Sequence, residues 1–128
     1  MIKIQSILKV VDNSGGKRAR CIKILGKSSK ANANIGDSII VSIKSLRPRY
    51  RSQVRIRVNK TEVHRGVVVQ TCRFSGYRDG RLFSFNNNAV VLITSQGKPL
   101  GTRILTFLPR ILRNLGWTKL GVLSKGFI

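Results

Sequence analysis

Short apolar segments alternate with turn-forming residues along the chain, a pattern that is typical of a compact β domain. Within several segments the apolar residues take every second position, which predicts strands with one buried and one wet face. The clearest case is 53–59, where Val54, Ile56 and Val58 alternate with Arg55 and Arg57. Strands are also expected at 7–11, 18–25 and 37–45.

Gly66 introduces three consecutive valines, and this β-branched run suits a strand that is buried on both faces. Asp79-Gly80 is a β-hairpin signal. Further turn-forming residues, Asn86 to Asn88, precede another apolar run. From these signals we expect two hairpin strands at 72–77 and 82–85, and a last barrel strand at 90–93.

After Phe107 the apolar residues change to the spacing of a helix. Pro109 fits the first turn of that helix, and Gly116 would end it. The segment 117–123 fits a second short helix or a strand equally well. The apolar positions at helical spacing are Leu108, Ile111, Leu112 and Leu115.

These elements predict a mainly all-β fold, in which five or more strands close into a small β-barrel with a projecting β-hairpin and short C-terminal helices. A chain of 128 residues is expected to form a single domain over 1–128. The barrel would span about 1–106 and the C-terminal helical part about 107–128.

The charge adds information about the partner. The sequence has 25 Lys and Arg against four acids, a net charge of +21 and a pI near 11.8. So few acids cannot neutralise the bases, and like charges on a compact domain repel one another. A polyanion relieves this repulsion and gains entropy from released counterions, so we expect nucleic acid as the partner.

The sequence gives no support for catalysis. No two of the acids (Asp12, Asp37, Glu62 and Asp79) share a plausible site, and no nucleophile elbow or phosphate-binding loop occurs. We therefore expect no enzyme activity, no cofactor and no bound metal. No stretch approaches the roughly 20 apolar residues of a membrane span, and the N-terminus has no secretory core.

The two cysteines, Cys21 and Cys72, are far apart in the sequence and have no zinc-ligand spacing. The preferred interpretation is a pair of buried thiols in a reduced compartment.

Basic residues gather around 47–57, in a Ser/Asn-rich loop near residue 30, and on both sides of the predicted hairpin turn. Arginine can bond phosphate with two donors and stack on bases, which favours an ordered interface. The predicted RNA-binding residues are Lys9, Arg18, Lys23, Lys27, Lys30, Arg47, Arg49, Arg51, Arg55, Arg57, Arg73, Arg78, Arg81, Lys98 and Arg103.

Aromatic residues lie between the basic residues of the hairpin, and they have two interpretations. They can stack on unpaired bases, or they can anchor the hairpin on the barrel. Anchoring is preferred for Phe83 and Phe85, and base stacking for Tyr77.

The apolar stripe of the predicted helix also has two interpretations. It can pack on the barrel, which is preferred, or it can meet a partner protein. Trp117 beside it favours a protein contact. The candidate protein-contact residues are Leu108, Arg110, Ile111, Arg113 and Trp117.

Several motifs together identify a family. The central one begins with Gly66 and its three valines and resumes nine residues later with Asp79-Gly80, Phe85, Asn88 and Val91-Leu92. Around it stand Val11-Asp12-Asn13-Ser14-Gly15, Cys21-Ile22-Lys23-Ile24-Leu25-Gly26, Ile35-Gly36-Asp37 and Gly101-Thr102-Arg103-Ile104. In these residues and spacings the chain resembles the universal large-subunit ribosomal protein family number fourteen, the L-fourteen family.

The resemblance implies a five-stranded β-barrel with a β-ribbon and a small helical C-terminal part. It implies a structural role, in which the protein binds large-subunit rRNA near the subunit interface and helps form a bridge to small-subunit rRNA. The implied protein partners are the neighbouring ribosomal proteins of the L-nineteen and L-three families and, in many members, a silencing factor that blocks subunit joining.

The chain departs from the family pattern at several places. Residues 59–62 replace a Lys-Lys-Gly-Asp-like turn, residues 50–57 are longer and more basic, Ile111 stands in place of an acid, and residues 124–128 replace an acidic end. Few acids and many Ile and Asn favour an organellar member. We expect a mitochondrial ribosome in the matrix and a chain encoded in the organelle, with plastid or bacterial ribosomes as alternatives.

Two other functions compete with a ribosomal role. A free-standing barrel that binds single-stranded nucleic acid would bind heterologous RNA and lie outside ribosomes. A cationic membrane-active protein would need an exposed amphipathic face, and the strand pattern instead assigns the apolar residues to a core.

Replacing Arg49, Arg51, Arg55 and Arg57 together by Gln is expected to weaken rRNA binding and leave the barrel folded. The measurement is the affinity for an rRNA fragment at several salt concentrations. An unchanged affinity and salt dependence would show that these arginines do not contact RNA.

Overall fold

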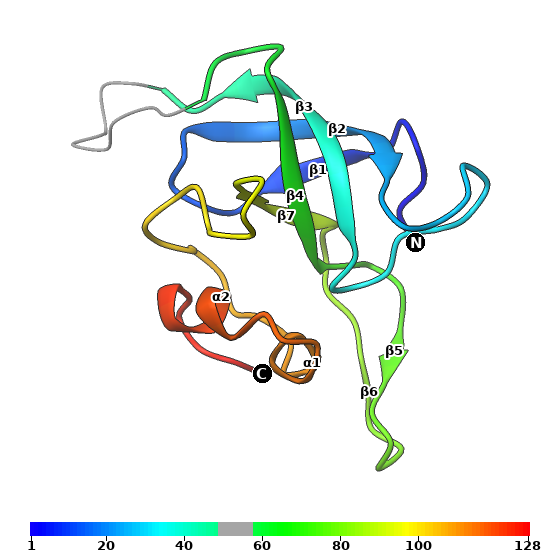
Figure 1. Ribbon diagram of the computed structural model, residues 1–128. Helices are drawn as coiled ribbons and strands as arrows, with labels where there is room; N and C mark the ends of the chain where they lie inside the picture. The colour runs from blue at the N-terminus through cyan, green and yellow to red at the C-terminus, as the bar shows by residue number, and fades with distance from the viewer. Residues whose placement is uncertain (49–57) are drawn as a thin grey trace.

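The computed structural model describes residues 1–48 and 58–128, and its centre is a closed barrel with the strand order β1–β2–β3–β4–β7 (Figure 1). Neighbouring strands are antiparallel except β1 and β7, which run parallel. The predicted mainly β fold and its barrel are therefore confirmed. The barrel strands are β1 (Ile7–Val10), β2 (Gly16–Ile24), β3 (Ser38–Leu46), β4 (Val63–Gln70) and β7 (Ala89–Ile93).

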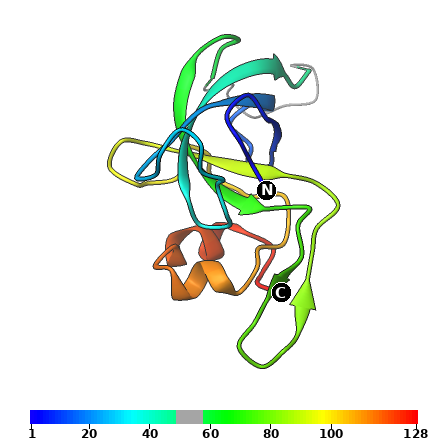
Figure 2. The ribbon, with the colours of Figure 1, turned by 90° about the vertical axis from the view of Figure 1, so that its right-hand side faces the viewer.

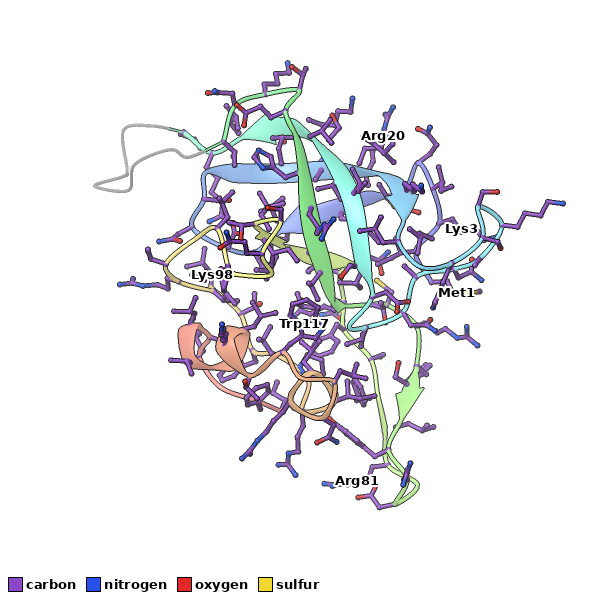
Figure 3. The ribbon with its side chains drawn as sticks, viewed as in Figure 1. Met1, Lys3, Arg20, Arg81, Lys98 and Trp117 are labelled. Carbon is purple, nitrogen blue, oxygen red and sulfur yellow. The ribbon has the colours of Figure 1, made fainter. Side chains whose placement is uncertain are left out.

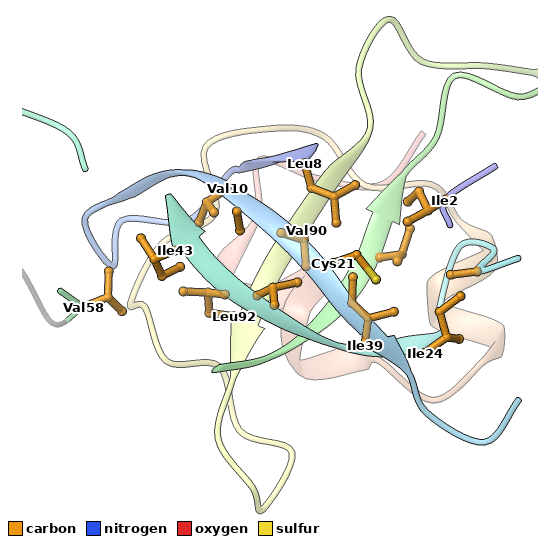
Figure 4. Close-up of a cluster of buried hydrophobic side chains, with 14 residues drawn as sticks. Ile2, Leu8, Val10, Cys21, Ile24, Ile39, Ile43, Val58, Val90 and Leu92 are labelled. Carbon is orange, nitrogen blue, oxygen red and sulfur yellow. The ribbon is translucent and has the colours of Figure 1, made fainter. Parts of the chain in front are cut away.

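The barrel interior is filled by one hydrophobic cluster to which all five strands contribute (Figure 4). In β3 the side chains of Ile39, Val41 and Ile43 are fully buried, as the alternating pattern predicts. Val58 joins the same cluster. The rest of the strand predicted at 53–59 lies outside the described residues, apart from Asn59, which the structure does not assign to a strand.

A second hydrophobic cluster lies outside the barrel and joins residues of β4 and β7 to the C-terminal part of the chain. Figure 2 shows this part, coloured orange and red, lying beside the barrel. The three valines of β4 are fully buried because Val68 points into the barrel while Val67 and Val69 point into this second cluster. Residues of β7 alternate in the same way. The prediction of a strand buried on both faces is thus confirmed.

Two short helices, α1 (Ile111–Asn114) and α2 (Thr118–Leu123), cover this second cluster. Leu112 and Leu120 are buried against the barrel, and the Trp117 indole Nε1 donates a hydrogen bond to the Gly36 carbonyl at 3.1 Å. The apolar stripe therefore packs on the barrel, as preferred from the sequence. The segment after Gly116 is helical, which decides the open alternative.

A hairpin of β5 (Ser75–Gly76) and β6 (Leu82–Phe83) projects away from the barrel (Figures 1 and 2). Its turn contains Gly80 with φ +88°, a conformation that glycine adopts without strain. Its strands are shorter than predicted, since the pairing register holds only from Ser75 with Phe83 to Gly76 with Leu82.

Aromatic residues anchor the hairpin. Phe83 and Phe85 pack against the second cluster, and the Tyr77 ring stacks on Phe83 with centroids 4.9 Å apart. The Tyr77 hydroxyl donates to the Ile128 carbonyl at 3.0 Å, which ties the hairpin to the C-terminal residue. Tyr77 therefore helps to anchor the hairpin through one face of its ring and its hydroxyl, and base stacking on the other face stays a prediction.

The two cysteines differ in exposure. Cys21 is fully buried inside the barrel, and burial raises the pKa of its thiol. Cys72 is exposed, because it follows the end of β4 in a bend rather than lying in a strand. The prediction of two buried thiols is correct for Cys21 and wrong for Cys72.

The buried side chain of Asp12 joins two parts of the fold. Its carboxylate accepts hydrogen bonds from the Ser14 hydroxyl and backbone N–H and from the Leu92 backbone N–H, the last at 3.0 Å. Burial raises the pKa of Asp12, and these hydrogen bonds oppose the rise. Asp12 thereby fixes the turn after β1 to the middle of β7.

Replacing Asp12 by Ala is expected to lower the free energy of unfolding by at least about 2 kcal/mol, because the buried N–H groups of Ser14 and Leu92 lose their acceptor. Asp12→Asn tests the charge. The pKa of Asp12 is raised above 3.8 in the folded state, so the folded protein binds this proton more tightly than the unfolded chain does. The free energy of unfolding therefore falls as the pH rises from below 3.8 through the folded pKa. Urea unfolding should therefore show wild type losing stability relative to Asp12→Asn across that window.

The control for this pH effect is Asp79→Asn. Hydrogen bonds from Arg81 lower the pKa of the exposed Asp79 below 3.8. Ionised Asp79 therefore stabilises the folded state, and this stabilisation is lost as the pH falls below 3.8. Parallel pH curves for wild type and Asp12→Asn would contradict the account of the buried carboxylate.

Candidate nucleic-acid interface

Two irregularities in β2 determine which of its side chains reach the surface. The pairing of β2 with β3 shifts on both sides of Arg18, between Gly16 and Arg18 and between Arg18 and Ala19, and again between Cys21 and Lys23. At each of these two places two consecutive residues face outward, so Lys17 and Arg18 are both exposed. A regular strand would turn one residue of each pair into the barrel.

The outer surface of β1, β2, β3 and the start of β4 carries exposed basic residues from each of these four strands. Register partners run across it: Lys9 lies opposite Arg18, while Lys23 and Arg65 both lie opposite Ile40. Arg20 projects from the same side of β2 (Figure 3). We call this area the basic sheet face, and it consists of Lys9, Lys17, Arg18, Arg20, Lys23, Lys44 and Arg65.

The acids of the protein lie elsewhere or are already bonded. Asp37 pairs with Lys27 at 2.6 Å, and Asp79 pairs with Arg81 at 2.6 Å. Glu62 bonds the His64 ring at 2.8 Å. Asp12 is buried within its own turn, so no carboxylate forms an ion pair with the basic sheet face among residues 1–48 and 58–128.

The pairing of Lys9 with Arg18 is unfavourable in the free protein. Both side chains are exposed, and their backbones are direct partners in the antiparallel ladder. Like charges in such positions destabilise a sheet. A phosphate group between them reverses the sign of the interaction, so the geometry is that of an anion-binding surface.

The type of contact follows from the other residues on this face. The exposed aliphatic side chains Ile7, Ile22 and Val63 lie among the cations, and the described strands β1 to β4 carry no aromatic residue. Binding of single strands relies on aromatic stacking platforms. The face is therefore suited to phosphate and sugar contacts, which position a protein on RNA without reading individual bases.

The structure distributes the predicted RNA-binding residues over several surfaces. Lys9, Arg18 and Lys23 come together on the basic sheet face. Arg49, Arg51, Arg55 and Arg57 lie outside the described residues. The others are Lys27 and Lys30 in the loop after β2, Arg73, Arg78 and Arg81 on the hairpin, and Lys98 and Arg103 in loops after β7.

Arg47 is half-buried and forms part of the fold. Its Nη2 donates to the Val10 carbonyl at 3.0 Å and its Nε to the Gly16 carbonyl at 3.3 Å. The guanidinium thereby bridges β1 and β2, while further donors remain on the same group.

Sequence reasoning missed four residues of the face: Lys17, Arg20, Lys44 and Arg65. Arg20 and Lys44 could have been found, since each alternates with a core residue along its strand. Lys17 becomes outward-facing through the β2 irregularity, which the alternation of residue types does not indicate.

The predicted protein-contact residues differ in exposure. Leu108 is fully buried in the second cluster, so its role lies within the fold. Ile111 and Trp117 are half-buried, and Arg110 and Arg113 are exposed. The part of this set that can reach a partner is therefore mainly basic.

No group of three or more His, Cys, Asp and Glu residues that could hold a metal ion occurs in the described part of the chain. Among the same residues, no helix has the length and apolar character needed to cross a bilayer.

A comparison with protein families bears on what this surface binds. The family model described as Ribosomal protein L14p/L23e matches residues 1–128, which is the whole length of the sequence. The match confirms the resemblance seen in the sequence motifs, and it agrees with a barrel that exposes an uncompensated basic face. The chain belongs to the ribosomal protein L14p/L23e family and is a structural, rRNA-binding constituent of the large ribosomal subunit rather than an enzyme.

Proposed function

We propose that the chain binds large-subunit rRNA through the basic sheet face, near the interface between the two subunits. The observation that carries this proposal is the direct pairing of Lys9 with Arg18 in a surface without carboxylate partners among the described residues. The packing of the C-terminal part also supports this proposal. This part covers the outer side of β4 and β7, so the outer side of β2 stays open to RNA.

Protein partners are proposed for the opposite side of the molecule. Arg110 and Arg113 are exposed there, and Val122 of α2 is 85% exposed. Two further exposed apolar residues, Phe74 and Leu82, lie on the hairpin. These surfaces would contact proteins of the L-nineteen and L-three families, a silencing factor, and small-subunit rRNA through an intersubunit bridge.

A mitochondrial ribosome is the proposed location. The support is compositional: four acids against 25 bases, together with abundant Ile and Asn, depart from the family pattern. Plastid and bacterial ribosomes stay as the alternatives.

Replacing Arg18, Arg20 and Lys23 together by Gln is expected to weaken binding to a large-subunit rRNA fragment and to lower the slope of log affinity against log salt by about 2–3, which is about one unit per lost phosphate contact. The three residues are exposed, so the barrel should stay folded. The measurement is the dissociation constant at several salt concentrations.

The matched control replaces Arg113, Lys119 and Lys125 by Gln, which removes the same charge from exposed positions on the C-terminal part, off the basic sheet face. The control should retain most of the salt slope. Equal losses in both variants would show that net charge alone drives binding. Equal affinity of wild type for unrelated structured RNA would favour a free-standing nucleic-acid binder.

A further inference from the structure

A cavity of about 370 Å³ opens at the edge of the basic sheet face. Its size falls in the range of small-ligand sites, and it exceeds what one phosphate group needs. Among the described residues, its lining consists of three cations and a mainly apolar remainder, namely Lys9, Lys17, Arg47, Val11, Pro48, Leu105 and Thr106.

The three cations come from three parts of the chain, and the fold fixes each of them. Lys9 faces outward from β1 because Leu8 and Val10 on either side of it point into the barrel. Lys17 faces outward because of the shift between Gly16 and Arg18.

Arg47 is held by three hydrogen bonds. Its backbone N–H donates to the Gly15 carbonyl at 2.9 Å, and its side chain donates to the Val10 and Gly16 carbonyls. The position of its guanidinium is therefore set before any ligand arrives, which reduces the entropy lost on binding.

The donors of the cavity exceed its acceptors. A guanidinium has five N–H donors, and two of those on Arg47 are used in the bonds to Val10 and Gly16, while each lysine carries three. No acid lines the cavity within residues 1–48 and 58–128. Asp12 acts on Arg47 through its charge, but its oxygens already accept bonds from Ser14 and Leu92.

The rest of the lining adds a hydroxyl and an apolar floor. The Leu105 N–H donates to the Val11 carbonyl at 2.8 Å, which holds these two residues together. The buried Thr106 hydroxyl oxygen has no hydrogen-bond partner within the described residues. An anion with several acceptor oxygens and an attached apolar group matches this combination of surfaces.

We propose that this cavity holds one phosphate group of the rRNA backbone, bound by Lys9, Lys17 and Arg47, with the adjoining ribose against Val11 and Leu105. The inference deepens the proposed function, since it assigns one fixed phosphate position to an interface that otherwise makes distributed contacts. A fixed phosphate sets the register of the RNA on the protein.

The first experiment is a titration of the whole chain with inorganic phosphate, followed by amide NMR. Saturable shifts are expected at Lys9, Lys17, Leu105 and Thr106, and addition of the rRNA fragment should displace the phosphate. In the double variant Lys9→Gln/Lys17→Gln the dissociation constant for phosphate should rise by about ten-fold or more, as expected when charge-assisted hydrogen bonds are lost. Arg47 is left intact because it supports the fold.

The matched control is Lys119→Gln/Lys125→Gln, which removes the same charge from exposed positions on the C-terminal part. It should leave the phosphate shifts in place. With rRNA, the pocket variant should lower the salt slope by about 1, and the control should leave it unchanged. Amide spectra of both variants report whether the barrel is intact.

Shifts that do not saturate, or that persist in the pocket variant, would overturn the proposal. Bound phosphate that rRNA fails to displace would overturn it too, because the ligand would then be a free phosphate. A wild-type protein that binds phosphate in the cavity but does not bind rRNA would refute the proposed function separately. If the variant Lys9→Gln/Lys17→Gln lost phosphate binding but kept the wild-type affinity and salt slope for rRNA, this inference alone would be refuted.

Discussion

Strands β4 and β7 pair side by side and send alternate side chains into two hydrophobic clusters. Val68, Val90 and Leu92 fill the barrel, while the residues between them support the C-terminal helices. The strands must approach closely, and a Cβ at Gly66 would lie 2.5 Å from the Val90 Cγ2 atom. Because one side of the barrel is covered in this way, the charges gather on the outer side of β1, β2 and β3.

The same division explains how a chain with a net charge of +21 can fold. Apolar burial is concentrated in two clusters, and no Lys or Arg is buried in the described ranges. Asp37, Glu62 and Asp79 are used within individual turns and loops, and Asp12 connects a turn to β7. What remains on the basic sheet face is repulsion, which the RNA backbone proposed to lie there would convert into attraction. On this proposal, the charges that lower the stability of the free protein are the same charges that raise its affinity for RNA.

Much of the fold follows from local patterns: β3 alternates regularly, the valines of β4 are buried on both sides, and Gly80 forms the hairpin turn. The site follows less well. Outward positions in β2 depend on three register shifts against β3, which only the pairing of strands reveals. Clustering along the sequence favoured the arginines of 47–57, whereas the basic sheet face is assembled from residues that are distant in the chain. The anchoring bond from Tyr77 to Ile128 could not be predicted from local patterns, because the two residues lie 51 positions apart in the chain.

The central claim is that rRNA lies on the outer side of β1, β2 and β3, and lysine acetylation of the free and rRNA-bound protein tests it most directly. Mass spectrometry of the peptides gives the protection of each lysine. The account predicts strong protection at Lys9, Lys17, Lys23 and Lys44, and little at Lys119 and Lys125 on the far side of the second cluster. Protection of the C-terminal lysines with the four face lysines still reactive would contradict it.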